Sequence, residues 1–375
     1  MSAEKQAAPA GETLVAQEPS PDRRVRLHSR IAVIINTLVG GVVGAAFGAF
    51  GNVVPWLLGG LLLGTLLGLA NEALFHRSRR LARWYKLRTV VLVLVESLVA
   101  LYVVIPAMGV YEATHPARVA VTGSPADLGL PYEDVIMSTA DGLALRGWYI
   151  ASQNGAAVIA LHGAGANRTQ LLRHAQALAR AGYGVLLFDL RAHGESDGTL
   201  FPMTDDSQDV APAVAFLQGR ADVDPERIGA VGLSLGGEVI LEAAARDPAL
   251  KPLVVDGVST NRIEDLLPLP REYRVMYLAA PMWWLGDRMA ALASGVPARP
   301  LTLLVKEIAP RPILFISSRE APEPFMNRRL AERAGPSAQL WALPDTGHVG
   351  GMFAHPEEYA QRMISFFDAA LLGEK

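Results

Sequence analysis

The sequence predicts an α/β fold, with a mostly parallel sheet covered by helices on both faces, preceded by three transmembrane helices. Three observations predict it. From about residue 132 onward, a β-hairpin signal is followed by apolar runs that alternate with helical patterns. A serine lies in a turn of small residues between a predicted strand and a predicted helix. Residues 31–70 contain no charged side chain, which is typical of membrane segments.

Composition narrows the class of protein. The chain has 375 residues and a formal net charge of −3, so it is not expected to bind nucleic acid. It has no cysteine, which excludes disulfides, a thiol nucleophile and cysteine metal sites. Its eight histidines form no zinc-binding pattern, and no glycine-rich phosphate loop is present. We therefore expect no metal and no nucleotide cofactor.

The mean hydropathy of the whole chain is +0.24. The apolar residues that raise it are concentrated near the N-terminus. Residues 1–30 are expected to form a disordered cytoplasmic tail, and 31–50, 56–75 and 89–110 to span the bilayer. Arginines lie before the first span and between the second and third. The positive-inside rule then predicts a multi-pass protein with an extracytoplasmic C-terminal domain. A cleaved signal peptide is disfavoured because the first apolar run begins late.

Glycines recur every four residues in the first two predicted spans, which places each set on one helix face. The two sets are Gly40, Gly44 and Gly48, and Gly60, Gly64 and Gly68. Such stripes allow close backbone approach, and we favour a tight hairpin of the two spans over oligomerisation through the same face. The sequence does not determine the oligomeric state.

Residues 111–131 are interpreted as a linker and 132–375 as the second domain. An Asp141-Gly142 turn joins two hairpin strands at 135–138 and 143–150. The later strands are expected at 156–161, 184–190, 228–231, 253–258, 313–317 and 339–343. The helices are expected at 169–181, 206–218, 238–245 and 357–371. Carboxyl ends of parallel strands are where ligands collect, so the loops after these strands are the candidate site.

The most informative of these loops is Val231-Gly-Leu-Ser-Leu-Gly-Gly237, between a predicted strand and a predicted helix. Small residues beside the serine allow a sharp turn that exposes the Ser234 hydroxyl at a helix N-terminus. Far along the chain, Gly347-His348 follows the last predicted strand. A serine hydroxyl needs a base to become a nucleophile, and His348 is the candidate.

Four segments together resemble the α/β-hydrolase family of esterases, lipases and serine aminopeptidases. They are residues 161–168 (LHGAGANR), 189–196 (DLRAHGES), the Ser234 turn, and 344–348 (PDTGH). The resemblance covers about residues 126–375 and implies an α/β-hydrolase fold, with residues 259–305 as a lid insertion. This insertion is rich in aromatic, Leu and Met side chains. It fits extra core helices and an apolar acyl-binding lid equally well.

The resemblance also implies roles for residues. Ser234 would be the nucleophile, His348 the base, and an acid between them in sequence would orient the histidine. The family often has an aspartate after the strand at 313–317, but this chain has Ser317-Ser-Arg-Glu-Ala-Pro-Glu323. Glu320 is therefore the first candidate, with Glu323 and Asp256 as alternatives. The backbone N–H groups of Leu235 and Ala164 would form the oxyanion hole.

The remaining polar residues of these loops are interpreted as structural. His162 and His193 are expected to shape loops by hydrogen bonding, and Asp189 and Arg191 to form a pair beneath the site. His174 is expected on an exposed helix face.

These features predict a membrane-anchored serine hydrolase that cleaves carboxylic esters of a small-molecule acyl substrate. Two alternatives stay open. The same residues could cleave amides or peptides, or the domain could be a non-catalytic binding or sensor module tethered to the membrane.

Overall fold

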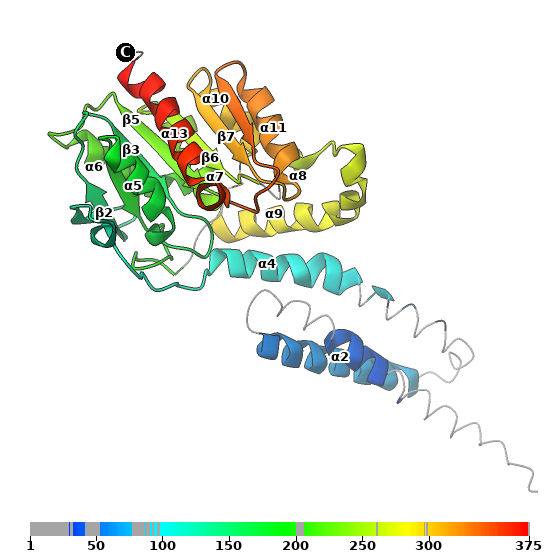
Figure 1. Cartoon of the computed structure of the whole chain (residues 1–375). Coiled ribbons are helices and arrows are strands. Elements are labelled where there is room, and N and C mark those ends of the chain that lie inside the picture. Colours follow the sequence, from blue (N-terminus) through cyan, green and yellow to red (C-terminus); the bar gives the residue numbers. More distant parts are fainter. Residues whose placement is uncertain are drawn as a thin grey trace, which may run out of the picture. The chain divides into compact units, whose positions relative to one another are not determined.

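The computed structural model of the chain describes residues 30, 33–41, 53–76, 87, 91, 94, 95, 98–199, 206–259, 262–295, 297 and 299–373. The chain divides into two compact units, Met1–Leu101 and Tyr102–Lys375 (Figure 1). Helix α2 (Val53–His76) belongs to the first unit, and the entire β-sheet belongs to the second.

In the first unit, residues 33–41 pack closely against α2 through glycines. A Cβ atom added to Gly40 would lie 2.2 Å from the carbonyl oxygen of Gly60, and one added to Gly64 would lie 2.1 Å from that of Asn36. The hydroxyls of Thr37 and Thr65 are 2.9 Å apart. The predicted pairing of the first two apolar segments is confirmed, because only glycine permits these approaches.

The membrane prediction is not confirmed. Within the described part of the chain, no helix combines the length and the hydropathy that a membrane span requires. The tail up to residue 29, residues 42–50 of the first predicted span, the basic loop at 77–86 and most of residues 88–97 lie outside the described residues. The three spans at 31–50, 56–75 and 89–110 therefore stay a prediction.

The second unit is built on one eight-stranded sheet in the order β1-β2-β4-β3-β5-β6-β7-β8. Strand β2 is antiparallel to both β1 and β4, and the remaining neighbours are parallel. The strands are β1 (Glu133–Ser138), β2 (Ala144–Ile150), β3 (Ala157–Leu161), β4 (Gly184–Phe188), β5 (Ile228–Leu233), β6 (Leu250–Asp256), β7 (Ile313–Ser317) and β8 (Ala338–Ala342). The predicted hairpin and parallel alternation are confirmed.

The central strands are apolar throughout because helices cover both faces of the sheet. All residues of β3, β4 and β5 are buried. Side chains alternate between the two faces, so Ile159 and Leu161 pack in one core cluster while Val158 and Ala160 pack in the other. Continuous runs of buried Val, Ile, Leu and Ala are what made these strands visible in the sequence.

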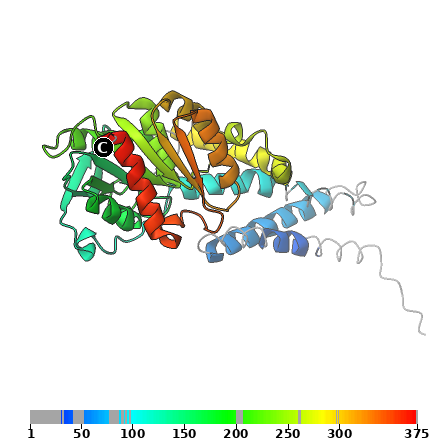
Figure 2. The same cartoon turned by 45° about the horizontal axis from the view of Figure 1, so that its top comes forward.

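The helices of this unit form two layers around the sheet (Figures 1 and 2). Helices α6, α7, α10 and α11 contribute to one core cluster, and α5, α12 and α13 to the other. Their bounds are α5 (Leu172–Arg180), α6 (Ala211–Gln218), α7 (Leu235–Arg246), α10 (Leu301–Ile308), α11 (Glu323–Ala334), α12 (Gly351–Ala354) and α13 (Pro356–Phe367). Short 3-10 or π turns occupy Pro125–Leu128, Arg168–Leu171, Asp206–Asp209 and Asp368–Leu372.

The expected lid at 259–305 is only partly a separate insertion. It contains α8 (Ile263–Leu266), a 3-10 segment η6 (Arg271–Ala279) and α9 (Ala280–Ser294), and then enters α10. Leu301, Leu304 and Val305 of α10 are fully buried in the main core. The η6 segment instead exposes Val275 by 71% and Leu278 by 70% of their surface. The insertion therefore ends before α10, and its outer part exposes apolar side chains such as Val275 and Leu278.

The boundary of the second unit differs from the expected start at residue 132. Helix α4 (Ile105–Thr114) lies within this unit and packs along α9, as both views show (Figures 1 and 2). The Tyr102 hydroxyl also donates a hydrogen bond of 3.0 Å to the carbonyl oxygen of Leu278. The end of the third predicted span and the linker at 111–131 thus form part of the sheet-containing unit.

Candidate active site

Ser234 lies at the turn between β5 and α7 with φ 51° and ψ −118°, a strained conformation for a residue with a side chain. Its N–H donates to the carbonyl oxygen of Asp256 at 2.7 Å, which fixes the turn to the neighbouring strand. The start of α7 can lie close to the end of β3 only because residue 236 is glycine. A Cβ on Gly236 would lie 2.4 Å from the carbonyl oxygen of Leu161. This geometry confirms the predicted turn and directs the Ser234 side chain out of the sheet edge.

His348 reaches the serine from the loop after β8, a strand that β6 and β7 separate from β5 in the sheet. Its Nε2 lies 2.9 Å from Ser234 Oγ. Gly257 makes room for the ring, since a Cβ there would lie 3.0 Å from His348 Cε1. The two residues are 114 positions apart in sequence and meet because β5 to β8 end at the same edge of the sheet.

Glu323 is the third member of a hydrogen-bonded row that runs from Ser234 through His348. Its Oε1 contacts Nδ1 of His348, while its Oε2 accepts hydrogen bonds from the N–H (3.0 Å) and the hydroxyl (2.8 Å) of Ser318. The carboxylate is buried. Burial alone would raise its pKa, but the hydrogen bonds from His348 and Ser318 outweigh burial and lower it. The hydrogen bond to Glu323 in turn raises the pKa of His348.

The first candidate for the acid, Glu320, is not the residue that contacts the histidine. Glu320 is exposed, and its Oε1 points toward Gly347, 2.9 Å from where a Cβ of that glycine would be. The loop after β7 is short, and α11 begins at Glu323 after Pro322, so the helix start brings Glu323 rather than Glu320 under the ring. An acidic residue next to prolines is a helix-start signal that could have shown this in the sequence.

Asp256, the third candidate, is also occupied elsewhere. Its side chain accepts a hydrogen bond of 2.9 Å from the Tyr359 hydroxyl, and its backbone carbonyl holds Ser234. Burial raises the pKa of Asp256 to about 7. It contributes a buried side chain beneath the site and makes no hydrogen bond to the His348 ring.

The two expected oxyanion donors lie on either side of the serine. Leu235 is the first residue of α7, and Ala164 follows Gly163, whose Cβ position would be 3.3 Å from Ser234 Cβ. Among the described residues, no hydrogen-bond acceptor binds the N–H of Leu235 or of Ala164. Two backbone donors without partners, beside a hydroxyl and at a helix N-terminus, form a site where negative charge is favoured.

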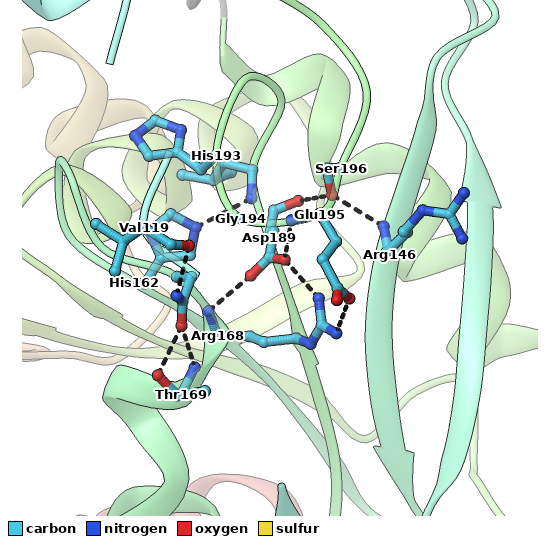
Figure 3. A network of polar contacts seen from close by, with 12 residues as sticks. Val119, Arg146, His162, Arg168, Thr169, Asp189, His193, Gly194, Glu195 and Ser196 are labelled. Carbon is cyan, nitrogen blue, oxygen red and sulfur yellow. Dashed lines mark hydrogen bonds and ion pairs between the residues drawn. The ribbon is translucent and has the colours of Figure 1, made fainter. Parts of the chain in front are cut away.

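Two histidines behave as structural groups, as expected. His162 is fully buried, and burial lowers its pKa to about 3. As a neutral ring it donates from Nδ1 to the Gly163 carbonyl (2.8 Å) and accepts from the Leu190 N–H at Nε2 (3.1 Å). His193 lies 5.0 Å from it between ring centroids (Figure 3). The ring of His162 therefore ties the loop that carries Ala164 to the loop after β4.

The expected pairing of Asp189 with Arg191 is wrong. Asp189 pairs with Arg168, and Arg191 pairs with Asp209 and Asp141 (Figure 3 for the former). The three aspartates and two arginines nevertheless form ion pairs that hold the loops, as expected for structural groups.

The expectation for His174 is also wrong. His174 is buried rather than exposed, packing edge-on against Tyr359 at 5.2 Å, and burial lowers its pKa to about 4. His174 lies on the side of α5 that packs inward against α13, together with the apolar residues of that helix.

Chemically, a serine hydroxyl hydrogen-bonded to a histidine, whose other nitrogen contacts a buried carboxylate, is an arrangement that can deliver an activated alkoxide. In the described part of the chain, no cluster of three or more His, Asp or Glu side chains could hold a metal ion.

Comparison with known proteins places this geometry in context. Residues 158–362 match the Alpha/beta hydrolase family. The chain is 33% identical over 258 residues to the uncharacterized protein YfhR of Escherichia coli, covering 64% of this chain and 81% of that protein. It is 35% identical over 128 residues to the thiohydrolase aneE of Aspergillus aculeatus, covering 33% of this chain and 40% of that protein.

Among solved structures, the esterase Pf2001 of Pyrococcus furiosus superposes with a TM-score of 0.57 at 25% identity, covering 69% of this chain and 98% of that one. The chain spans only 40% to 54% of the length of the first curated relatives it matches. The family match, at residues 158–362, falls within the sheet-containing unit.

Proposed function

Because the chain belongs to the α/β-hydrolase family, we propose that it is a serine hydrolase that cleaves carboxylic esters through an acyl-enzyme. The observation that carries this proposal is the hydrogen-bonded row from Ser234 through His348 to Glu323. Each contact has the direction that general-base activation of a hydroxyl requires. The unpartnered N–H groups of Leu235 and Ala164 support the same chemistry.

In the proposed reaction, Ser234 Oγ attacks the acyl carbonyl carbon while His348 Nε2 takes the hydroxyl proton. The carbonyl oxygen becomes an oxyanion, which the N–H groups of Leu235 and Ala164 stabilise. The oxyanion collapses, the bond to the alcohol breaks, and His348 returns the proton to the departing alkoxide. Water, deprotonated by the same ring, then attacks the acyl-serine, and as the bond to Ser234 Oγ breaks and the acid leaves, His348 returns the proton to Oγ. Glu323 holds the ring and stabilises its protonated form throughout.

Esters are preferred over amides because an alkoxide leaves more easily than an amine. A thioester is the second candidate, since one similar protein is named a thiohydrolase and another structure an esterase. The exposed apolar side chains of Val275, Leu278 and Trp284 in the insertion favour an apolar acyl group.

A panel of nitrophenyl esters graded by chain length, measured beside matched thioesters and amides, tests the proposed function. We expect turnover of esters or thioesters that Ser234→Ala abolishes, with amides slower by orders of magnitude. A folded wild-type protein inactive on the whole panel and unreactive toward a fluorophosphonate would favour the non-catalytic binding module instead. A substrate preference for amides would move the protein to the peptidase class.

The proposed enzyme is anchored in the membrane by three spans, with its hydrolase unit outside the cytoplasm. The charge-free stretch 31–70 and the arginines that flank the apolar segments support this topology. Protease added to intact cells should digest the C-terminal unit, and protease added to inverted vesicles should not. Digestion only in inverted vesicles would show that the unit faces the cytoplasm. Recovery of the whole chain in the fraction without membranes would rule out the anchor.

A further inference from the structure

The segment between α4 and β1 docks onto the loop after β4 through the side chain of Arg118. Its Nη1 donates to the carbonyl oxygens of His193 (3.3 Å), Gly194 (2.9 Å) and Ser196 (2.6 Å), and its Nη2 donates to that of Gly198 (2.6 Å). One guanidinium thus holds four carbonyls of the loop that follows β4. Residues 111–131 had been expected to be only a linker, so this contact was not visible in the sequence.

The same segment also touches the loop that carries Ala164. The side-chain amide of Asn167 donates to the carbonyl oxygens of Val119 and Ala120, both at 3.1 Å. Its Oδ1 accepts from the N–H of Thr169 at 3.0 Å and so caps the following turn. Residues 118–120, which we name the strap, therefore bind the β3 loop and the β4 loop at once.

These two loops are joined to each other beneath the strap (Figure 3). Asp189 accepts from the N–H of Arg168 at 2.7 Å and from the N–H of Glu195 at 2.9 Å. At the other end, the Leu190 N–H donates to His162 Nε2 at 3.1 Å. Both ends of residues 162–168 are consequently fixed by the β4 loop. Ala164 lies between the two fixed ends, so movement of the β4 loop would move the Ala164 N–H.

Arginine is suited to this task by its shape. The guanidinium carries five donors in one rigid plane and can bind carbonyls from residues that are up to five positions apart in the loop. A lysine ammonium has its donors at one point and cannot reach the Gly198 and His193 carbonyls together. If only a positive charge were needed at position 118, lysine would preserve activity. If the four carbonyl contacts are needed, lysine should fail as well.

We propose that Arg118 is a positioning residue for the Ala164 oxyanion donor, acting through the β4 loop, and that the strap is part of the active-site machinery. This inference rests on the proposed hydrolase function. A donor displaced from the oxyanion loses its contribution to the transition state but not to substrate binding. The expected signature is therefore a loss in kcat rather than a rise in KM.

The test measures kcat, KM and thermal midpoint of the full chain on a nitrophenyl ester, with the inhibition constant of a trifluoromethyl ketone. Arg118→Met should lower kcat about 10- to 100-fold and change KM less than about threefold. The inhibitor, which mimics the oxyanion, should weaken by about the factor lost in kcat/KM. Arg118→Lys should be about as impaired as Arg118→Met, whereas Arg180→Met, on the exposed end of α5, should match wild type.

Asn167→Asp provides a second, independent variant, because it keeps the cap on Thr169 but replaces the donor to the strap with a carboxylate. It decides the matter if Arg118→Met fails to fold, and the same drop in kcat is expected. A folded variant with kcat within about twofold of wild type, or with a change in KM alone, would overturn the inference. Wild-type protein that neither turns over the ester nor reacts with a fluorophosphonate would remove the proposed function and this inference together.

Discussion

Glu320 and Glu323 are three residues apart after β7 and carry the same side chain. Only Glu323 contacts His348. Glu323 is buried and bound by Ser318, while Glu320 is exposed. The choice between them is set by where α11 begins, which the spacing in the sequence did not reveal. The chemistry of the residue types was therefore predictable, whereas choosing the acid required the helix-start signal at Glu323, which residue spacing alone does not contain.

Substitution of each glutamate separates the two. Glu323→Gln should lower kcat about 10³- to 10⁴-fold, because the amide can neither hold the correct tautomer of His348 nor stabilise its protonated form. Glu320→Gln is the matched control and should change kcat less than about threefold. Steady-state kinetics on a nitrophenyl ester measures both. A larger loss in Glu320→Gln than in Glu323→Gln would return the role to Glu320.

The pH dependence of the reaction reports on the same contact. The hydrogen bond to Glu323 raises the pKa of His348, and only the unprotonated ring can accept the Ser234 proton. The kcat/KM of wild type should therefore rise with pH through a midpoint above the ordinary histidine value of about 6.5. Glu323→Gln removes the charge that favours protonation, so its residual activity should rise at lower pH than that of wild type. A midpoint that is unmoved or higher in Glu323→Gln would contradict the pairing.

At the level of elements, the turn between β5 and α7 depends on glycines that lie against backbone atoms. A Cβ on Gly236 would meet the Leu161 and His162 carbonyl oxygens at 2.4 and 2.6 Å, and neither backbone can move without shifting β3. The same contact brings α7 close to the loop of Ala164. The turn therefore sets both the stability of the central sheet and the distance between the two oxyanion donors.

Gly236→Ala should consequently destabilise the sheet-containing unit by about 1–3 kcal/mol or more, seen as a lower midpoint in thermal or denaturant unfolding. Gly219→Ala is the control, because its Cβ would meet carbonyl oxygens only at 3.6 Å, an ordinary contact, at the exposed end of α6. It should change stability by less than about 0.5 kcal/mol. Equal effects of the two substitutions would show that the close approach at Gly236 is relieved elsewhere.

Elements differed in how far the sequence revealed them. Strands β3, β4, β5 and β7 are nearly continuous apolar runs between turn residues, so their positions could be read from local pattern, whereas β6 also contains Lys251, Pro252 and Asp256. Helix α11 follows Pro322 and has Pro324 in its first turn, and it is not among the helices expected from the sequence. The predicted lid at 259–305 runs into α10, whose leucines pack in the main core. Whether an apolar helix faces core or solvent depends on tertiary packing, which periodicity alone does not contain.

At the scale of the whole molecule, the sheet-containing unit begins at Tyr102 rather than near residue 132. Helix α4 falls partly in the third predicted span, at 105–110, and partly in the predicted linker, at 111–114. Its packing on α9 and the four carbonyls bound by Arg118 are contacts between segments far apart in sequence. The order of functional groups along the chain was predictable, whereas the docking of α4 and Arg118 within the sheet-containing unit was not.

The central claim is that one hydroxyl, that of Ser234, is activated by His348. Reaction of the full chain with a fluorophosphonate, followed by intact mass and peptide mapping, tests it directly. The account predicts a single adduct on the peptide that contains Ser234, absent in Ser234→Ala and formed far more slowly in His348→Ala. An adduct on a different serine, or none on folded wild-type protein, would contradict it.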